Sequence, residues 1–245
     1  KWKIMNGVIE LNNVKIMGIL NVTPDSFYDG GKYLNKNEAI KRIREMIDEG
    51  ADIIDIGAES TRPGSTPLDI ETEFERLKDI VEESVSYGIP VSIDTYKPKI
   101  AEYVLEHGAR IINDIYGLRN EEMAEIVKRF GAGIIIMHMK GDPENMQNDP
   151  KYTDVISETL HFLRERIEFA INKGIKLEHI SADPGIGFGK NMEHNIKIIK
   201  HLEVYKTLGV PITIGLSRKS FLGKLTGLDV ENRLIPSISA AMFSV

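Results

Sequence analysis

The 245-residue chain contains no cysteine, which excludes disulfide bonds and thiolate metal sites. It also lacks a run of about 18 apolar residues, so we expect no membrane-spanning segment. A net charge of −6 argues against a nucleic-acid-binding surface. Residues 1–7 turn polar too early for a signal peptide, and the lack of cysteine suits a reducing cytoplasm. We therefore expect a cytoplasmic protein whose partners are small molecules.

No segment has the composition of an interdomain linker, since no Pro/Ser/Gly-rich stretch, low-complexity tract or charge block interrupts the chain. Residues 1–245 are therefore expected to form a single domain. At its start, residues 3–5 and 8–11 resemble the two strands of a hairpin around an Asn6-Gly7 turn. Asn-Gly supplies the positive φ angles that a two-residue turn requires.

Short Ile/Val-rich runs alternate with stretches of helical periodicity along the rest of the chain. Continuous apolar runs are typical of parallel strands that are buried on both faces. The predicted strands are 15–22, 52–58, 90–95, 110–115, 133–139, 179–183 and 211–216. The predicted helices are 37–49, 70–86, 98–107, 120–130, 153–173, 192–208 and 230–243, most of them followed by glycine.

Repeated strand–helix units without a topological break favour a TIM (β/α)₈ barrel over a doubly wound sheet. The count reaches only seven strands, so strand and helix eight are missing from the sequence given. An open barrel would leave two unpaired apolar edges. We therefore expect a C-terminally truncated barrel; the alternative is a natural barrel of seven units.

Polar residues follow the apolar runs at their carboxyl ends, where parallel barrels keep their chemistry. After the first predicted strand come Asn21 and Asp25, whose oxygens could hold a hard cation. The same Thr-Pro-Asp-Ser stretch could instead simply cap a turn. After the second strand, Arg62 suits an anionic group because its guanidinium offers a planar fork of donors.

The next strands end in Asp94-Thr95 and Asn113-Asp114. A carboxylate beside an amide can read the donor–acceptor edge of a heterocycle such as a 2-amino-4-oxo pyrimidine ring. Each polar pair on its own could also be a strand-end cap. The sixth run ends in Asp183, a second carboxylate of this kind, followed by a Gly-rich loop that allows close backbone approach to a ligand.

The fifth run ends in Met137-His138. Met137 could pack on a planar ligand or could fill the core, and His138 is interpreted as a hydrogen-bonded core histidine because no second histidine sits at ligand spacing. The last run leads into residues 217–220, where two cations and two hydroxyls precede a helix. This arrangement favours an anion site over a solvated basic turn.

These segments together resemble the dihydropteroate synthase family. The matching segments are Asn-Val-Thr-Pro-Asp-Ser-Phe (21–27), Glu-Ser-Thr-Arg-Pro-Gly (59–64), Asp-Thr (94–95), Asn-Asp (113–114), Asp-Pro-Gly-Ile-Gly-Phe-Gly-Lys (183–190) and Ser-Arg-Lys-Ser (217–220). The resemblance implies a TIM barrel and a transferase of folate biosynthesis, acting at the step that sulfonamides block. The implied reaction joins p-aminobenzoate to 6-hydroxymethyl-7,8-dihydropterin pyrophosphate and releases pyrophosphate.

The resemblance also implies roles for individual residues. The pterin ring would be held by Asp94, Asn113, Asp183 and Lys219, with Met137 beside it. Of these, Asp94, Asp183 and Lys219 would be the catalytic residues. The p-aminobenzoate site would be formed or bordered by Phe27, Thr61, Arg62, Pro63, Phe188 and Ser220. Asn21 would help bind the cofactor Mg²⁺ together with pyrophosphate. The family's Arg-x-His pair on strand eight has no counterpart in the sequence given.

Two other interpretations stay open at this point. A pterin-dependent methyltransferase is a related barrel that would need the Asp/Asn pterin contacts but not residues 61–64 or 217–220. A non-catalytic pterin- or anion-binding protein is the second alternative. Ile235, Ile238 and Phe243 on the last predicted helix could belong to barrel packing or to a possible homodimer face.

Overall fold

The computed structural model describes residues 1–22, 31–60 and 65–245, and the side chains of 31–35 lie outside this description. Its main sheet has six parallel strands in chain order. They are β3 (Met17–Asn21), β4 (Ile53–Gly57), β5 (Val91–Asp94), β6 (Ile111–Asp114), β7 (Gly133–Met137) and β8 (Ile180–Asp183). A separate antiparallel hairpin pairs β1 (Trp2–Ile4) with β2 (Gly7–Ile9).

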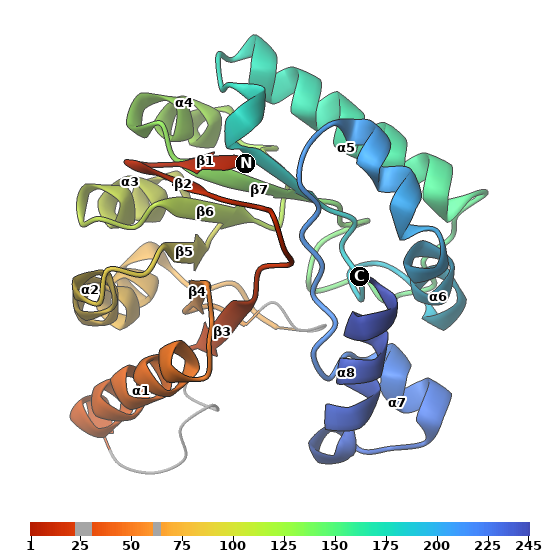
Figure 1. Cartoon of the computed structure of the whole chain (residues 1–245), viewed down its shortest axis with the longest axis horizontal. Coiled ribbons are helices and arrows are strands. Elements are labelled where there is room, and N and C mark those ends of the chain that lie inside the picture. The colour runs from red at the N-terminus through yellow and green to blue at the C-terminus, as the bar shows by residue number, and fades with distance from the viewer. Residues whose placement is uncertain (23–30, 61–64) are drawn as a thin grey trace.

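Helices lie outside this curved sheet (Figure 1). They are α1 (Gly31–Asp48), α2 (Ile70–Ser86), α3 (Pro98–Glu106), α4 (Glu121–Phe130), α5 (Val155–Asn172), α6 (Met192–Lys200), α7 (Ser220–Thr226) and α8 (Leu234–Phe243). In α4, Asn120 accepts a hydrogen bond from the Glu122 amide at the start, and Gly131 ends the helix at φ 60°. Helix ends of this kind follow from local sequence and need no long-range contact.

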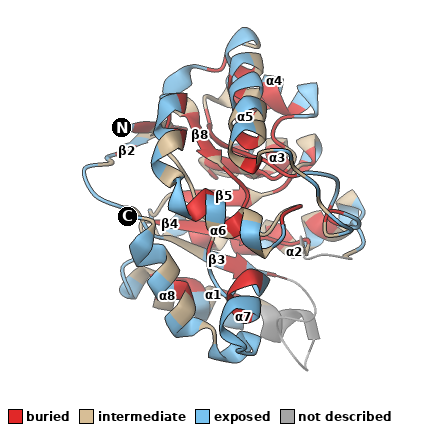
Figure 2. Ribbon diagram, turned by 90° about the vertical axis from the view of Figure 1, so that its right-hand side faces the viewer, coloured by how far each residue is buried: buried red, intermediate tan, exposed pale blue. Residues whose placement is uncertain are grey.

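Alternate residues of each strand face the helices and the barrel axis. Ile54 and Ile134 belong to the main core formed with the helices. Ile53 and Ile135, one residue away on the same strands, pack with Trp2 of the hairpin in a second cluster. Figure 2 shows the buried strands enclosed by helices whose outer faces are exposed. The hairpin therefore fills the amino end of the barrel and leaves the carboxyl end for the polar residues.

The hairpin turn lies one residue earlier than the sequence predicts. Ile4 pairs with Gly7, so the two turn residues are Met5 and Asn6, and Asn6 takes the positive φ of 54°. Trp2 explains the register, since its indole nitrogen donates to the carbonyl of His179 at 2.9 Å and its ring is buried against the sheet. A long-range contact thus overrides the local preference of Asn-Gly.

The prediction of a regular strand over 211–216 is wrong. This segment makes one parallel bridge, between Ala182 and Ile212, and its backbone bonds to β8 involve only Pro211 and Thr213. A proline has no N–H to extend a ladder, and no described strand pairs with the other side of the segment. At the opposite end of the sheet, the outer edge of β3 has no partner strand in the described ranges either, and Ile19 is 52% exposed.

Two predicted helices are divided in the structure. The stretch 192–208 consists of α6, which ends at Lys200 with His201 as its C-cap, and a 3₁₀ helix, Leu202–Leu208. The stretch 230–243 begins with a 3₁₀ turn, Val230–Asn232, before α8. The strands 15–22 through 179–183 and the remaining helices are confirmed as elements, with ends that shift by a few residues and an α1 that begins six residues early.

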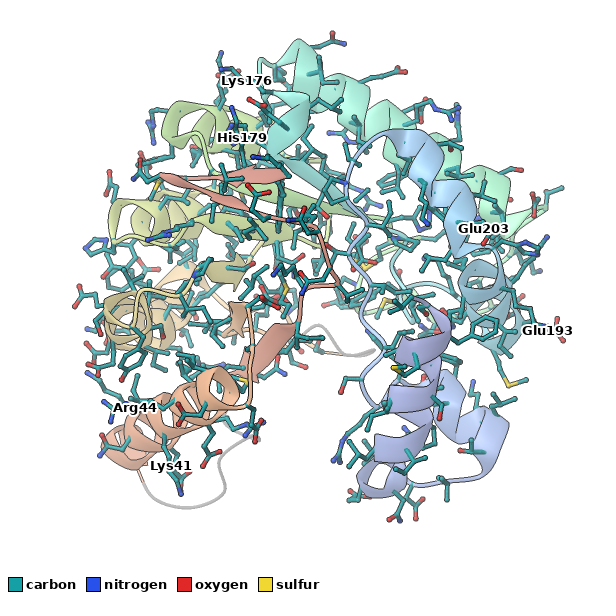
Figure 3. All side chains as sticks on the ribbon, viewed as in Figure 1. Lys41, Arg44, Lys176, His179, Glu193 and Glu203 are labelled. Carbon is teal, nitrogen blue, oxygen red and sulfur yellow. The ribbon has the colours of Figure 1, made fainter. Side chains whose placement is uncertain are left out.

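The outer faces of the helices carry charged side chains. Lys41, Arg44, Glu193 and Glu203 point away from the sheet (Figure 3). Within the described part of the chain, no helix is both long enough and apolar enough to cross a membrane.

Candidate active site

Polar side chains from neighbouring strands lie at the same level of the sheet, at its carboxyl end. Asn21 pairs in register with Gly57, Gly57 with Asp94, and Asp94 with Asn113. Gly57 has no side chain between its neighbours, and a Cβ there would lie 3.4 Å from Asp94 Cβ and 3.7 Å from Asn21 Oδ1. The register therefore brings the amide of Asn21, the carboxyl of Asp94 and the amide of Asn113 to one rim.

The opposite part of the rim carries the second predicted carboxylate and the lysine. Asp183 ends β8, pairs with Met137, and accepts a hydrogen bond from the Gly185 amide at 2.7 Å. Lys219 precedes α7, and its ammonium lies 4.3 Å from the centre of the Phe188 ring. Gly187 makes room for this lysine, because a Cβ there would lie 3.1 Å from Lys219 Cδ.

Burial sets the protonation of these groups. It raises the pKa of Asp94 well above the usual range, and the negative charges of Asp55 and Glu73 raise it further. It raises the pKa of Asp183 to about 6, although the Gly185 amide and Lys219 oppose the shift. It also lowers the pKa of Lys219, which Asp183 and Asp94 partly restore. The rim therefore holds two carboxyl groups whose pKa values are raised by burial, beside a lysine whose pKa is lowered by burial.

The Gly-rich loop after β8 is held by a buried lysine. Lys190 Nζ donates to the carbonyls of Gly185 and Phe188, each at 2.9 Å, and lies 2.9 Å from His138 Nδ1. Burial and Lys190 lower the pKa of His138 to about 2, so its ring is neutral. The prediction that His138 is a hydrogen-bonded core histidine is confirmed. Only glycine fits at position 185, where φ is 71° and a Cβ would lie 1.9 Å from the His138 oxygen.

Apolar side chains line the same end of the barrel. Met137 is buried with Ile115, Met139 and Met146, and the half-buried ring of Phe188 packs against this cluster. The cluster lies directly beside Asp183, since Met137 and Asp183 are paired in register. A planar ligand bound by the rim carboxylates would thus have thioether and aromatic surfaces next to it.

Two groups of charged residues at this end were not among the residues predicted from the sequence. Asp55 lies within β4 and is 4% exposed. Glu59, Glu73 and Lys97 form a buried ion-pair cluster in which the lysine contacts both carboxylates. A signal for Asp55 was present, because it is the one charged residue of the run Ile53–Gly57. No comparable signal linked the members of the ion-pair cluster, which come from separate elements.

The remaining predicted residues divide into two kinds. Ser220 begins α7 and is exposed, and Asn21 is exposed at the end of β3. Phe27, Thr61, Arg62 and Pro63 lie outside the described residues. In the ranges that the structure describes, no three His, Cys, Asp or Glu side chains gather as metal ligands.

A parallel α/β barrel with carboxylates, an amide and a lysine beside apolar side chains at its carboxyl end is typical of barrel enzymes that bind a small polar heterocycle. The family model described as "Pterin binding enzyme" matches residues 17–245. The chain is 43% identical to the dihydropteroate synthase of Clostridium beijerinckii over 94% of this chain and 84% of that protein. The chain therefore belongs to the pterin binding enzyme family, as a member of its dihydropteroate synthase group.

Solved structures agree with this assignment and with the TIM-barrel fold. The dihydropteroate synthase of Thermus thermophilus in complex with 4-aminobenzoate has a TM-score of 0.89 at 39% identity, covering 98% of this chain and 88% of that one. The same enzyme in complex with 6HMPPP has a TM-score of 0.85 at 37% identity, covering 98% and 87%. The Yersinia pestis enzyme with a sulfonamide drug complex has a TM-score of 0.93 at 36% identity, covering 99% and 88%.

Proposed function

We propose that this chain catalyses the dihydropteroate synthase reaction, joining p-aminobenzoate to 6-hydroxymethyl-7,8-dihydropterin pyrophosphate with release of pyrophosphate. The convergence of Asp94, Asn113 and Asp183 on one rim beside Lys219 is the observation that carries the proposal. The complexes of the Thermus enzyme with 4-aminobenzoate and 6HMPPP support this pair of substrates.

The pterin would lie at the carboxyl end of the barrel with its ring edge against the rim. The carboxyl oxygens of Asp94 and of ionised Asp183 accept hydrogen bonds from ring and amino N–H groups, and Lys219 donates to a ring acceptor. Met137 and Phe188 provide apolar contact beside the ring. This arrangement is complementary to both the hydrogen-bond donors and the acceptors of a 2-amino-4-oxo heterocycle.

The second substrate would bind towards α7. Ser220 at the start of this helix is proposed to lie near the carboxylate of p-aminobenzoate, and Phe188 to border its ring. Phe27, Thr61, Arg62 and Pro63 are proposed to complete this site on the strength of the family resemblance alone.

Asn21 is proposed to hold Mg²⁺ with the pyrophosphate group. Asn21 is exposed, and its oxygen lies at the rim close to Gly57. This position fits a metal that takes few protein ligands and fills its shell with phosphate oxygens and water. When bound, Mg²⁺ would stabilise the charge of the leaving pyrophosphate.

We propose a dissociative displacement at the pterin methylene. The carbon–oxygen bond to pyrophosphate breaks with its electron pair leaving on oxygen, and the electron-rich ring shares the resulting positive charge. Asp94 and Asp183, fixed at the ends of β5 and β8, favour that charge as it develops, an effect worth several kcal/mol. The aromatic amine, uncharged at neutral pH, then attacks the methylene and loses a proton.

Pyrophosphate release tests the proposal directly. With both substrates and Mg²⁺, we expect pyrophosphate and 7,8-dihydropteroate in equal amounts. Tight pterin binding without turnover would favour a non-catalytic binding protein. Binding of methyltetrahydrofolate in preference to the pyrophosphate ester would favour a methyltransferase.

A homodimer through α8, where Ile235 and Phe243 are exposed, and a cytoplasmic location stay predictions.

Affinity for the pterin is expected to fall as the pH drops through about 6. Asp183 must lose its proton to accept N–H donors, and its pKa in the free protein is about 6. If only the ionised form binds, affinity decreases by about tenfold per pH unit below 6. Calorimetric titration with 6-hydroxymethyl-7,8-dihydropterin between pH 5 and 8 measures the profile.

Asp114 provides a matched control for this profile. Its pKa is also raised to about 6, but its carboxylate accepts from the backbone amides of Tyr116 and Leu118. The fall in pterin affinity near pH 6 should persist in Asp114→Asn and be absent in Asp183→Asn. A pH-independent affinity in the unaltered protein would contradict the role of Asp183.

A further inference from the structure

A buried carboxylate lies one layer below the rim, directly behind Asn113. Asp55 sits in the middle of β4, with Ile19 of β3 and Ser92 of β5 as its neighbours in register. It is 4% exposed in a strand whose other side chains are isoleucines. A carboxylate in such surroundings costs stability unless it is bonded, so a purely structural role would be served better by an apolar residue.

The hydrogen bond that this carboxylate accepts comes from the rim. Asn113 Nδ2 donates to Asp55 Oδ2 at 3.1 Å. The amide of Asn113 is planar, so directing its nitrogen to Asp55 turns its oxygen away from Asp55. In the opposite orientation the oxygen of Asn113 would face the ionised carboxylate of Asp55, and neither group could donate.

We propose that Asp55 is a positioning residue that fixes the amide of Asn113 so that Oδ1 is presented to an N–H donor of the bound heterocycle. The inference rests on the proposed function for the identity of that heterocycle. Asp55 touches no substrate in this proposal and acts through Asn113 alone. It adds a requirement to the site: the ligand must offer a donor where Asn113 presents its acceptor.

Other features of the carboxyl agree with this role. Oδ1 of Asp55 and Oγ of Ser92 are buried, and neither has a well-formed hydrogen bond in the described part of the chain. Burial raises the pKa of Asp55, while the nearby Ser92 hydroxyl and the Asn113 amide lower it by favouring the ionised form. The hydrogen bond from Asn113 is thus the main contact that offsets the free-energy cost of burying the Asp55 carboxylate.

A double-mutant cycle tests the proposal. Asp55→Leu keeps the shape of the side chain and removes its acceptors, whereas Asp55→Asn retains an oxygen that can accept from Asn113. In calorimetry with 6-hydroxymethyl-7,8-dihydropterin, we expect Asp55→Leu to weaken binding by about tenfold and Asp55→Asn by less than about threefold. In an Asn113→Ala background, Asp55→Leu should cause no further loss.

Ser181→Ala is a matched control, because Ser181 lies on β8 and its hydroxyl bonds to Pro211 and Thr213 away from Asn113. It should leave the affinity unchanged. Equal affinity of Asp55→Leu and the unaltered protein, or additive losses in the cycle, would overturn the proposal. So would a loss of thermal stability in Asp55→Leu without any change in the affinity of the folded protein, since that result means a role in folding alone.

A measurement without ligand separates this inference from the proposed function. The side-chain NH₂ signals of Asn113 in ¹⁵N NMR, assigned by their loss in Asn113→Ala, should exchange slowly in the unaltered protein and in Asp55→Asn. They should exchange fast in Asp55→Leu. If the unaltered protein fails to bind the pterin, the proposed function fails, and the NMR comparison still decides whether Asp55 orients Asn113. Equal exchange in all three proteins would refute that orientation.

Discussion

Alanine at Asp94 or at Lys219 is expected to lower the affinity for 6-hydroxymethyl-7,8-dihydropterin by about 100-fold or more, which is loss of detectable binding in calorimetry. Each substitution removes a charge-assisted hydrogen bond to the ring. Each also changes the charge balance of the rim, since Asp183 and Asp94 both raise the pKa of Lys219. The measurement is a titration at pH 7 with parallel thermal unfolding to confirm the fold.

Exposed residues of the same type serve as controls. Lys41 points away from the sheet on α1 (Figure 3), and Asp229 is exposed just before the 3₁₀ turn Val230–Asn232. Lys41→Ala and Asp229→Ala should bind the pterin as the unaltered protein does. Unchanged affinity in both Asp94→Ala and Lys219→Ala would show that the rim is not the pterin site.

Methionine at Lys97 is expected to reduce the free energy of unfolding by about 3–5 kcal/mol. Lys97 contacts the carboxylates of Glu59 and Glu73, and Glu73 is 1% exposed. Without the ammonium, two buried carboxylates would lie near each other with no counter-charge. Urea denaturation followed by circular dichroism measures the change.

The hydrogen bonds around this cluster explain why it matters to the rim. Glu59 also accepts from the amide of Leu68 and from the hydroxyl of Tyr96, each at 2.9 Å. Glu73 accepts from Thr95, the residue after Asp94, at 2.7 Å. The cluster thus ties the segment after β4 to the end of β5.

Two comparisons distinguish a lost counter-charge from lost packing. The triple variant Lys97→Met, Glu59→Gln, Glu73→Gln should recover most of the stability, because no buried charge remains unpaired. Lys78→Met breaks a surface pair with Glu75 and should change stability by less than about 0.5 kcal/mol. A loss below about 1 kcal/mol for Lys97→Met would mean that solvent already neutralises the cluster.

Much of the fold follows from local sequence because periodicity and helix ends are local properties. The run Ile53–Gly57 is apolar enough to be recognised as a buried strand, and Gly131 ends its helix where a left-handed residue is needed. The segment 211–216 shows the limit of that reasoning. Its apolar pattern resembles that of a strand, but Pro211 has no N–H to extend the ladder with β8, and the pairing stops at one bridge.

The hairpin shows the same limit at the level of one residue. Asn6-Gly7 has the composition of a two-residue turn, yet the structure places the turn at Met5-Asn6. The register follows Trp2, which is buried against the sheet and donates to His179, 177 residues away. The turn preference of Asn-Gly therefore stabilised the hairpin register less than the burial of the large Trp2 ring did.

The amino-acid sequence by itself determined which residues stand at the carboxyl ends of the strands, because Asp94, Asn113 and Asp183 each follow a recognisable apolar run. Only the tertiary structure decided how these groups act on one another. The bond between Asn113 and Asp55 spans 58 positions, and the contact between Lys97 and Glu59 spans 38. The raised pKa of Asp183 arises from burial by elements distant in the chain. The direction of a hydrogen bond and the strength of a charge–charge interaction depend on how closely the groups approach and on how far they are removed from water. Both are fixed only once the strands have come together.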